Sequence, residues 1–270
     1  MSSGNPVSGF PRRGNLKVPV FNSLYEKRLW MLEHMAGALR IFGRNGYNEG
    51  SAGHITIVDP VDPTSYWINP SGVHVSMITV RDLDHVNADG EAIGGSKAPF
   101  SMPGFKIHYQ MHKARPEISS ICHAHTFYAR TFSVFGKKLG MMSQDSCLVY
   151  ENHVVMDDYT NIGFDEVEGD KVSSVLGDEM AIILQNHGAM TVGKTVDETG
   201  YLLILLDFTC KAQLLADAVA ANNDAVEQII PDKVAKSAFD SISGPSSLYA
   251  ALQPDYELEV FLSKGDFLQY

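Results

Sequence analysis

Residues 115–125 read RPEISSICHAH, and this stretch decides how the 270-residue chain is interpreted. The apolar segment Ile118–Cys122 predicts a buried strand, and His123 and His125 follow at its carboxyl end. In α/β proteins ligands tend to gather at that end of a strand. The i, i+2 spacing places both imidazoles on the same side of extended backbone. Two imidazoles need this geometry to bind one cation at about 2.0–2.1 Å each.

A second strand end offers another imidazole. Residues 181–188 read AIILQNHG, so His187 follows the apolar strand Ala181–Leu184, and Gly188 is expected to let the backbone turn sharply. Together the two strand ends predict a three-histidine metal site. From the residues alone, this site and a chance pairing of histidines remain open alternatives. His34, His85 and His153 lie in contexts typical of structural or surface histidines.

Periodicity and capping signals divide the rest of the chain into helices and strands. Helices are expected over residues 22–44, 103–113, 127–135, 165–176 and 196–221. Strands are expected over residues 54–59, 65–69, 118–122 and 181–184, with a short meander over 81–95. Thr195 and Glu198 form a capping box for the last helix. Beyond it, Pro231, Gly244–Pro245 and Pro254 are expected to break the helical segments.

The fold class predicted from this order is α/β, with a single domain. We expect a flexible N-terminal arm over residues 1–21 and the domain itself over 22–221. A helical C-terminal extension over 222–270 would pack on the domain or on a neighbouring subunit.

Composition argues against several classes of partner. The net charge of −11 and the pI near 5.3 disfavour nucleic acid and anionic membranes, which reward a basic surface. The 3 cysteines form no C-x-x-C pair, so a disulfide framework is not expected and a reducing compartment fits better. No apolar run has the length of a signal-peptide core or a membrane span. A cytoplasmic protein is therefore expected.

Four motifs in order resemble the class II aldolase/adducin family. They are NEGSAGHIT at 48–56, INPSG at 68–72, RPEISSICHAH at 115–125, and LQNHG at 184–188 before a long helix. The resemblance runs from about Asn22 to Ala221. It implies a divalent metal held by His123, His125 and His187, and a central, mainly antiparallel sheet flanked by helices. It also implies a homo-oligomer, usually a four-fold tetramer with sites between subunits.

The chain departs from the sugar-phosphate aldolases of that family at the substrate site. Where those enzymes have Ser-Ser-Glu, including a catalytic Glu, this chain has Met102-Pro103-Gly104. Where they have Asn in a G-N-x-S loop, it has His54. A phosphate needs several converging hydrogen-bond donors, so these changes argue against a sugar-phosphate substrate. The substrate pocket is expected to persist with other contents, lined by Ser51, His54, Ser71, Gly72 and Gly104.

Other features resemble a divergent branch of the family. They are the Gly53–Thr56 segment, the Asn69–Gly72 turn, the Gly104–His108 helix and the pair Gln144-Asp145. Some members of that branch are metal-dependent oxygenases or decarboxylases that act on aromatic 2-oxo acids. His108 is the first candidate for a general base, with support behind the metal site as its alternative role. Asp145 and Gln144 are the next catalytic candidates.

Three functions are weighed against one another. The favoured one is a metal-dependent carbon–carbon lyase, cleaving a non-phosphorylated hydroxy or oxo compound by retro-aldol reaction or decarboxylation through a metal-chelated enolate. The alternative is an Fe(II)-dependent oxygenase or oxidative decarboxylase of an aromatic 2-oxo acid. An adducin-like interaction module is disfavoured because all three metal histidines are present. Zinc is the favoured metal, with iron(II) or manganese as alternatives, and the partner is a small molecule.

Overall fold

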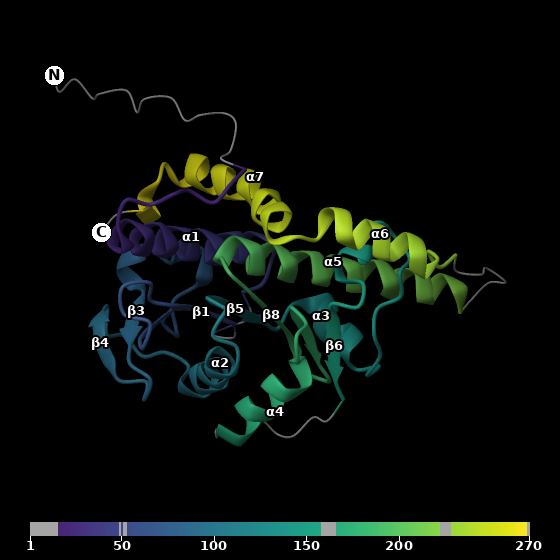
Figure 1. Cartoon of the computed structure of the whole chain (residues 1–270), viewed down its shortest axis with the longest axis horizontal. Coiled ribbons are helices and arrows are strands. Elements are labelled where there is room, and N and C mark those ends of the chain that lie inside the picture. The colour runs from purple at the N-terminus through teal and green to yellow at the C-terminus, as the bar shows by residue number, and fades with distance from the viewer. Residues whose placement is uncertain (1–15, 49, 51–52, 158–165, 222–227, 269–270) are drawn as a thin grey trace.

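The computed structural model describes residues 16–48, 50, 53–157, 166–221 and 228–268. At its centre lies a mixed β-sheet (Figure 1). Within these residues the sheet has 8 strands in the order β4-β3-β2-β1-β5-β8-β7-β6. The strands are β1 His54–Val58, β2 Tyr66–Ile68, β3 Asp84–Val86, β4 Ala92–Gly95, β5 Ser120–Ala124, β6 His153–Met156, β7 Ala181–Leu184 and β8 Gly188–Gly193. Only β6 and β7 pair in parallel; the other described pairs are antiparallel. The predicted α/β fold with a mainly antiparallel sheet is confirmed.

Helices cover both faces of this sheet. They are α1 Leu24–Arg44, α2 Met102–Ala114, α3 Phe127–Ser133, α4 Glu166–Leu176, α5 Val196–Ala220, α6 Asp232–Ile242 and α7 Pro245–Ser263. Figure 1 shows α1, α5 and α7 along one face and α2 and α4 along the other. The main apolar cluster joins α1, α5 and α7 to the sheet, and a second cluster joins α2 and α4 to it.

Strand alternation decides which side chains reach the site. On β1, Ile55 and Ile57 belong to the core on the α1 and α5 side. Thr56 points the opposite way and hydrogen-bonds histidines of α2, and His54, two residues earlier, shares that side. On β5 the Cys122 thiol contacts Thr199 of α5, which places His123 on the α2 side. The site histidines of β1 and β5 therefore share one face of the sheet.

The helix starts follow their capping signals. The side chain of Ser23 accepts a hydrogen bond from the backbone N–H of Glu26 at the start of α1. Thr195 does the same for Glu198 at the start of α5. The second half of the predicted capping box differs, because the Glu198 carboxylate accepts from the Lys194 N–H and not from that of Thr195. These local hydrogen bonds satisfy backbone donors that have no partner inside the helix, so each cap fixes where its helix begins.

Some elements differ from expectation. Strands β6 and β8 were not predicted. Pro254 was expected to break a helical segment, but it lies inside the continuous helix α7. The buried side chains of Leu248, Leu252 and Val260 hold α7 against the core on both sides of the proline. That packing offsets the one backbone hydrogen bond that the proline removes.

The C-terminal helices lie close to the rest of the fold. Helix α7 packs against α1 and α5, and Gln253 of α7 donates a hydrogen bond to the buried Asp197 of α5. Of the arm expected over residues 1–21, residues 1–15 lie outside the described part. The division at residue 221 stays a prediction. No described helix combines the length and the apolarity that crossing a membrane requires.

If α7 is an integral part of the fold, shortening its buried face should destabilise the whole protein. Leu252 is 1% exposed, whereas Leu262 on the same helix is 55% exposed. We expect Leu252→Ala to lower the free energy of unfolding by about 2–5 kcal/mol, because it leaves a cavity. Leu262→Ala, the matched control, should change it by less than about 0.5 kcal/mol. Urea unfolding followed by circular dichroism measures both, and equal effects would contradict this packing role.

Candidate metal centre

Three histidines converge where β5, β7 and β8 meet. His123 is the penultimate residue of β5, and His125 follows the end of that strand. His187 lies in the turn between β7 and β8. Strand β5 pairs with β8 through His123 opposite Met190 and Ala124 opposite Ala189. This register brings the β7–β8 turn beside the end of β5, so the structure joins the two predicted strand ends.

The turn that carries His187 is built differently from the sequence-based expectation. Its left-handed residue is Asn186, with φ of 58°, and not Gly188. Asparagine tolerates this conformation better than most side chains. Gly188 instead permits a close approach, because a Cβ there would lie 2.7 Å from the carbonyl oxygen of Ala124. The glycine therefore lets the turn approach β5.

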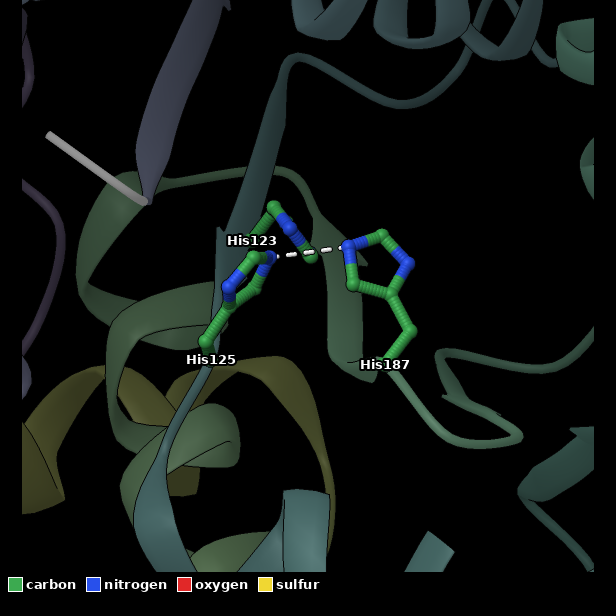
Figure 2. Close-up of side chains that lie close together, drawn as sticks. All are labelled: His123, His125 and His187. Carbon is green, nitrogen blue, oxygen red and sulfur yellow. Dashed lines mark hydrogen bonds between the residues drawn. The ribbon is translucent and has the colours of Figure 1, made fainter. Parts of the chain in front are cut away.

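The three imidazoles point toward one another (Figure 2). One ring nitrogen from each lies within 4.8 Å of the others. The ring centroids are separated by 4.6–5.0 Å, and Nε2 of His125 lies 2.8 Å from Nε2 of His187. This spacing is close to that of nitrogen ligands around one ion with metal–nitrogen bonds of about 2.0–2.1 Å.

Hydrogen bonding and burial prepare these nitrogens as ligands. The Nδ1 of His123 lies 3.0 Å from the carbonyl oxygen of Ala189. A carbonyl only accepts, so Nδ1 carries the proton and Nε2 keeps a lone pair toward the cluster. Burial, followed by the charge of His187, holds the pKa of His123 well below its usual range. Burial and then His125 lower the pKa of His187 to about 4. Neutral imidazole is the form that binds metal, so the donor set fits a divalent cation.

A second group of histidines lies directly behind the first. His54 stands opposite His123 in the β1–β5 register, with ring centroids 5.2 Å apart. His108 of α2 follows, with its ring centroid 4.4 Å from that of His54. Both side chains are buried, and burial lowers the pKa of His54 to about 4. The Nε2 atoms of His54 and His108 have no hydrogen-bond partner among the described residues.

A chain of hydrogen bonds fixes the proton positions behind His108. Nδ1 of His112 lies 3.2 Å from the carbonyl oxygen of Ile118, so it donates and its Nε2 accepts from Thr56. The Thr56 hydroxyl oxygen then accepts from Nδ1 of His108, 2.8 Å away. This order leaves Nε2 of His108 as a buried acceptor without a partner among the described residues. A base at this position fits either role considered for His108.

The other predicted site residues are placed as follows. Ser51 lies outside the described residues. The side chain of Asn69 accepts a hydrogen bond from the Ile55 N–H, which ties the turn containing Ser71 and Gly72 to β1 beside His54. Gln144 and Asp145 are exposed, and Asp145 lies near Tyr201, whose pKa it helps to raise after burial. The described contacts of Asp145 do not run to the three histidines, so the catalytic role of this pair stays a prediction.

Sequence reasoning did not identify three groups that shape the site. They are the Ala189 carbonyl, Thr56 and His112. The signal for Thr56 was present in the sequence, because it lies two residues after His54 on the same strand face. His108 and His112 are four residues apart on one helix, which places both against Thr56. The Ala189 carbonyl depends on the register of β5 with β8, which no local pattern reveals.

A sequence profile described as Class II Aldolase and Adducin N-terminal domain matches residues 33–214. The chain belongs to this family. A solved structure of L-fuculose 1-phosphate aldolase from Glaciozyma antarctica PI12 superposes with a TM-score of 0.85 at 34% identity. That comparison covers 93% of this chain and 97% of the other. The expectation of the class II aldolase/adducin fold is thereby confirmed.

Two curated members of the family are also similar. The Meiotically up-regulated gene 14 protein of Schizosaccharomyces pombe is 45% identical, over 92% of this chain and 96% of that protein. A Streptomyces roseochromogenus protein named 4-hydroxy-3-prenylphenylpyruvate oxygenase/4-hydroxy-3-prenylbenzoate synthase is 36% identical, over 88% of this chain and 85% of its own length. These similarities span nearly the whole family domain.

The donor set makes a direct prediction about metal content. We expect about one divalent ion per chain in protein purified without added metal, as three imidazole ligands provide a catalytic-type site. His123→Ala should remove this stoichiometric metal, and elemental analysis measures it. His85→Ala is the matched control, since His85 stacks on Trp67 on a different part of the sheet. Full metal in a His123→Ala, His125→Ala double variant would show that the ligands are wrong.

The lowered pKa values also predict how stability depends on pH. Burial is the main cause that brings the pKa of His54, His112 and His187 to about 4, against about 6.5 in an unfolded chain. The stabilising contribution of these neutral histidines to the free energy of unfolding is therefore present above their pKa in the unfolded chain. It is lost as pH falls toward their lower pKa in the folded protein. For metal-free protein we expect the free energy of unfolding to drop by about 1 kcal/mol per histidine between about pH 7 and about pH 5.5. Urea titrations at the two pH values test this; constant stability would contradict it.

Proposed function

We propose that this protein is a metal-dependent enzyme that cleaves a carbon–carbon bond in a small, non-phosphorylated oxo or hydroxy acid. The observation that carries the proposal is the convergence of the nitrogens of His123, His125 and His187 within 4.8 Å. Neutral imidazoles leave a bound divalent ion its full charge and open positions for a ligand. Such an ion supplies Lewis-acid activation of a chelated carbonyl compound. Zinc is the favoured ion, with iron(II) or manganese as alternatives.

The start of α2 supports a substrate without phosphate. A phosphate is best bound by free backbone N–H groups at a helix start. Here Pro103 has no N–H to offer, and the Gly104 N–H donates to the Ser101 side chain at 3.3 Å. Met102, at the first helical position, presents an apolar side chain that is 37% exposed. The lack of an N–H on Pro103 and the engagement of the Gly104 N–H support a substrate without phosphate.

The residues around the metal centre suggest how a proton is handled. Gly104 carries no acid, so proton transfer falls to other groups or is not required. His108 presents a bare Nε2 acceptor, fixed by Thr56, and its burial keeps it neutral. Loss of carbon dioxide from a 2-oxo acid needs no proton abstraction from carbon, whereas retro-aldol cleavage needs a base. Decarboxylation therefore makes the smaller demand on this set of side chains.

A second candidate function is oxidative cleavage of an aromatic 2-oxo acid. The observation that favours it is the 36% identity with a protein whose name describes a prenylphenylpyruvate oxygenase and prenylbenzoate synthase. The same three imidazoles suit iron(II), and Gly104 supplies no carboxylate that would occupy a further coordination position. Both candidates break a carbon–carbon bond beside a chelated carbonyl.

The homo-oligomer, a tetramer in the expected form, stays a prediction that light scattering tests.

A substrate panel tests the proposed function. Metal-reconstituted protein is assayed on arylpyruvates, short 2-oxo and hydroxy acids, and fuculose 1-phosphate. We expect kcat/KM for the sugar phosphate to be at least about 10²-fold lower than for the best acid, because the site lacks the general acid–base group that is worth about that factor. The His123→Ala, His125→Ala variant is the control for contaminating activity. Oxygen consumption measured in air with iron(II), and product formation measured under argon, separate the oxygenase from the lyase.

Efficient retro-aldol cleavage of fuculose 1-phosphate or another common sugar phosphate would overturn the proposal. That outcome has a concrete basis, since the solved relative at 34% identity is named for that substrate. Turnover of an acid by the variant that lacks both β5 histidines would also count against it, because the reaction would then not need the candidate metal centre.

A further inference from the structure

Two positions 50 residues apart in the sequence share one volume of space. The first turn of α2 lies against the start of β1, so Gly104 lies beside His54. A Cβ on Gly104 would lie 2.3 Å from Cε1 and 2.4 Å from Nε2 of His54. Nonbonded carbon atoms normally approach to only about 3.5–4.0 Å. Any side chain at position 104 therefore competes with the imidazole of His54 for the same place.

The imidazole of His54 is held in this place from several sides. His54 pairs with His123 across β1 and β5, and its ring contacts those of His123 and His108. Behind them, Thr56 and His112 are fixed by hydrogen bonds. His54 is 7% exposed, so the ring has little freedom to move away. The space is filled by a rigid side chain that touches one of the three candidate metal ligands.

The polar edge of this ring is left without a partner. Nε2 of His54 is buried and forms no well-aligned hydrogen bond with a described residue, although the ring lies close enough to the Gly104 backbone for an interaction that raises the pKa of His54 against the larger effect of burial. Leaving such an atom unsatisfied typically costs about 1–3 kcal/mol. Buried groups of this kind are rare in native proteins, and a ligand is one common explanation. The adjacent candidate metal centre is where a ligand would bind.

We propose that His54 replaces the side chain that Gly104 lacks, and that its Nε2 hydrogen-bonds a chelating acid at the candidate metal centre. The second half rests on the proposed function; the first half, the steric pairing of His54 with Gly104, does not. The ligand is an oxo or hydroxy acid whose polar oxygen lies on the α2 side of the three histidines. The alternative role for His54 is packing alone. In that case the ring matters for stability but its Nε2 atom does not matter for ligand binding.

A double-variant cycle on the metal-free full-length protein tests the steric pairing. Gly104→Ala alone should lower the Tm by roughly 2–4 °C or more, because the new methyl group collides with the imidazole. In a His54→Ala background the same change should cost nothing or raise the Tm, since alanine favours a helix over glycine. Differential scanning calorimetry measures both steps. Equal losses in the two backgrounds would overturn the pairing.

Oxalate binding to the metal-loaded protein tests the hydrogen bond. His54→Gln and His54→Asn form a matched pair, because a glutamine amide reaches the position of Nε2 whereas the shorter asparagine does not. Calorimetric titration should show that His54→Asn weakens oxalate binding about tenfold, as expected for one hydrogen bond to a charged group. His54→Gln should restore affinity to within about threefold of the starting protein. Metal content, measured on the same samples, should be equal in all three.

The outcomes separate this proposal from the proposed function. Unchanged oxalate affinity in His54→Asn, with full metal, would reduce His54 to a packing residue and overturn the hydrogen bond alone. Equal weakening in His54→Asn and His54→Gln would do the same, because the position of Nε2 would then be irrelevant. Absence of metal and of oxalate binding in the starting protein would overturn the proposed function and the hydrogen bond with it. The steric cycle would still stand or fall by its own result.

Discussion

The hydrogen bond from Nδ1 of His123 to the Ala189 carbonyl is the contact on which the site depends. It joins the central strand β5 to β8 at a spacing of 3.0 Å, and it sets which nitrogen of His123 is free. The same register carries His187 to the end of β5 through the short β7–β8 turn. A slip of one residue would turn every side chain of β5 to the other face. Cys122 would then face α2, and His123 would be buried against α5.

This constraint explains which parts of the fold could be predicted from the sequence. Strand β5, which carries His123, and strand β7, which precedes His187, were recognisable because each apolar run and its histidine are neighbours in the chain. Strand β8, GAMTVG, is buried on both faces and lacks the alternation that marks a strand. The prediction of a helix break at Pro254 was wrong because tertiary packing stabilises α7 on both sides of the proline. Gly188 was expected to let the backbone turn sharply, but the residue with positive φ in this turn is Asn186, at 58°.

The candidate site, too, was predicted only where neighbouring residues in the chain carry the signal. Local spacing was enough to nominate His123, His125 and His187, and the structure brings their nitrogens together. His54 and Gly104 were noticed only as two separate departures from the family pattern. Their shared volume depends on how α2 packs on β1, which no local pattern states. Gln144 and Asp145 precede the short helix Ser146–Val149 in an exposed segment, where spacing along the chain says little about distance from the metal centre.

The chemistry of the site follows from keeping many imidazoles neutral in one place. His54, His108, His112 and His123 are all buried, and burial is the first cause of each lowered pKa. Charged imidazoles this close would repel one another, so neutrality is what lets the cluster fold. The free-energy cost of burying polar atoms without hydrogen bonds falls mainly on the Nε2 atoms of His54 and His108, which lack partners among the described residues. Pro103 has no N–H and the Gly104 N–H already donates to Ser101, so these two residues offer a ligand no backbone donor. In the proposed function, the affinity of the ligand comes from chelation at the three histidines and from Nε2 of His54, which favours a compact, polar-headed acid over a phosphate.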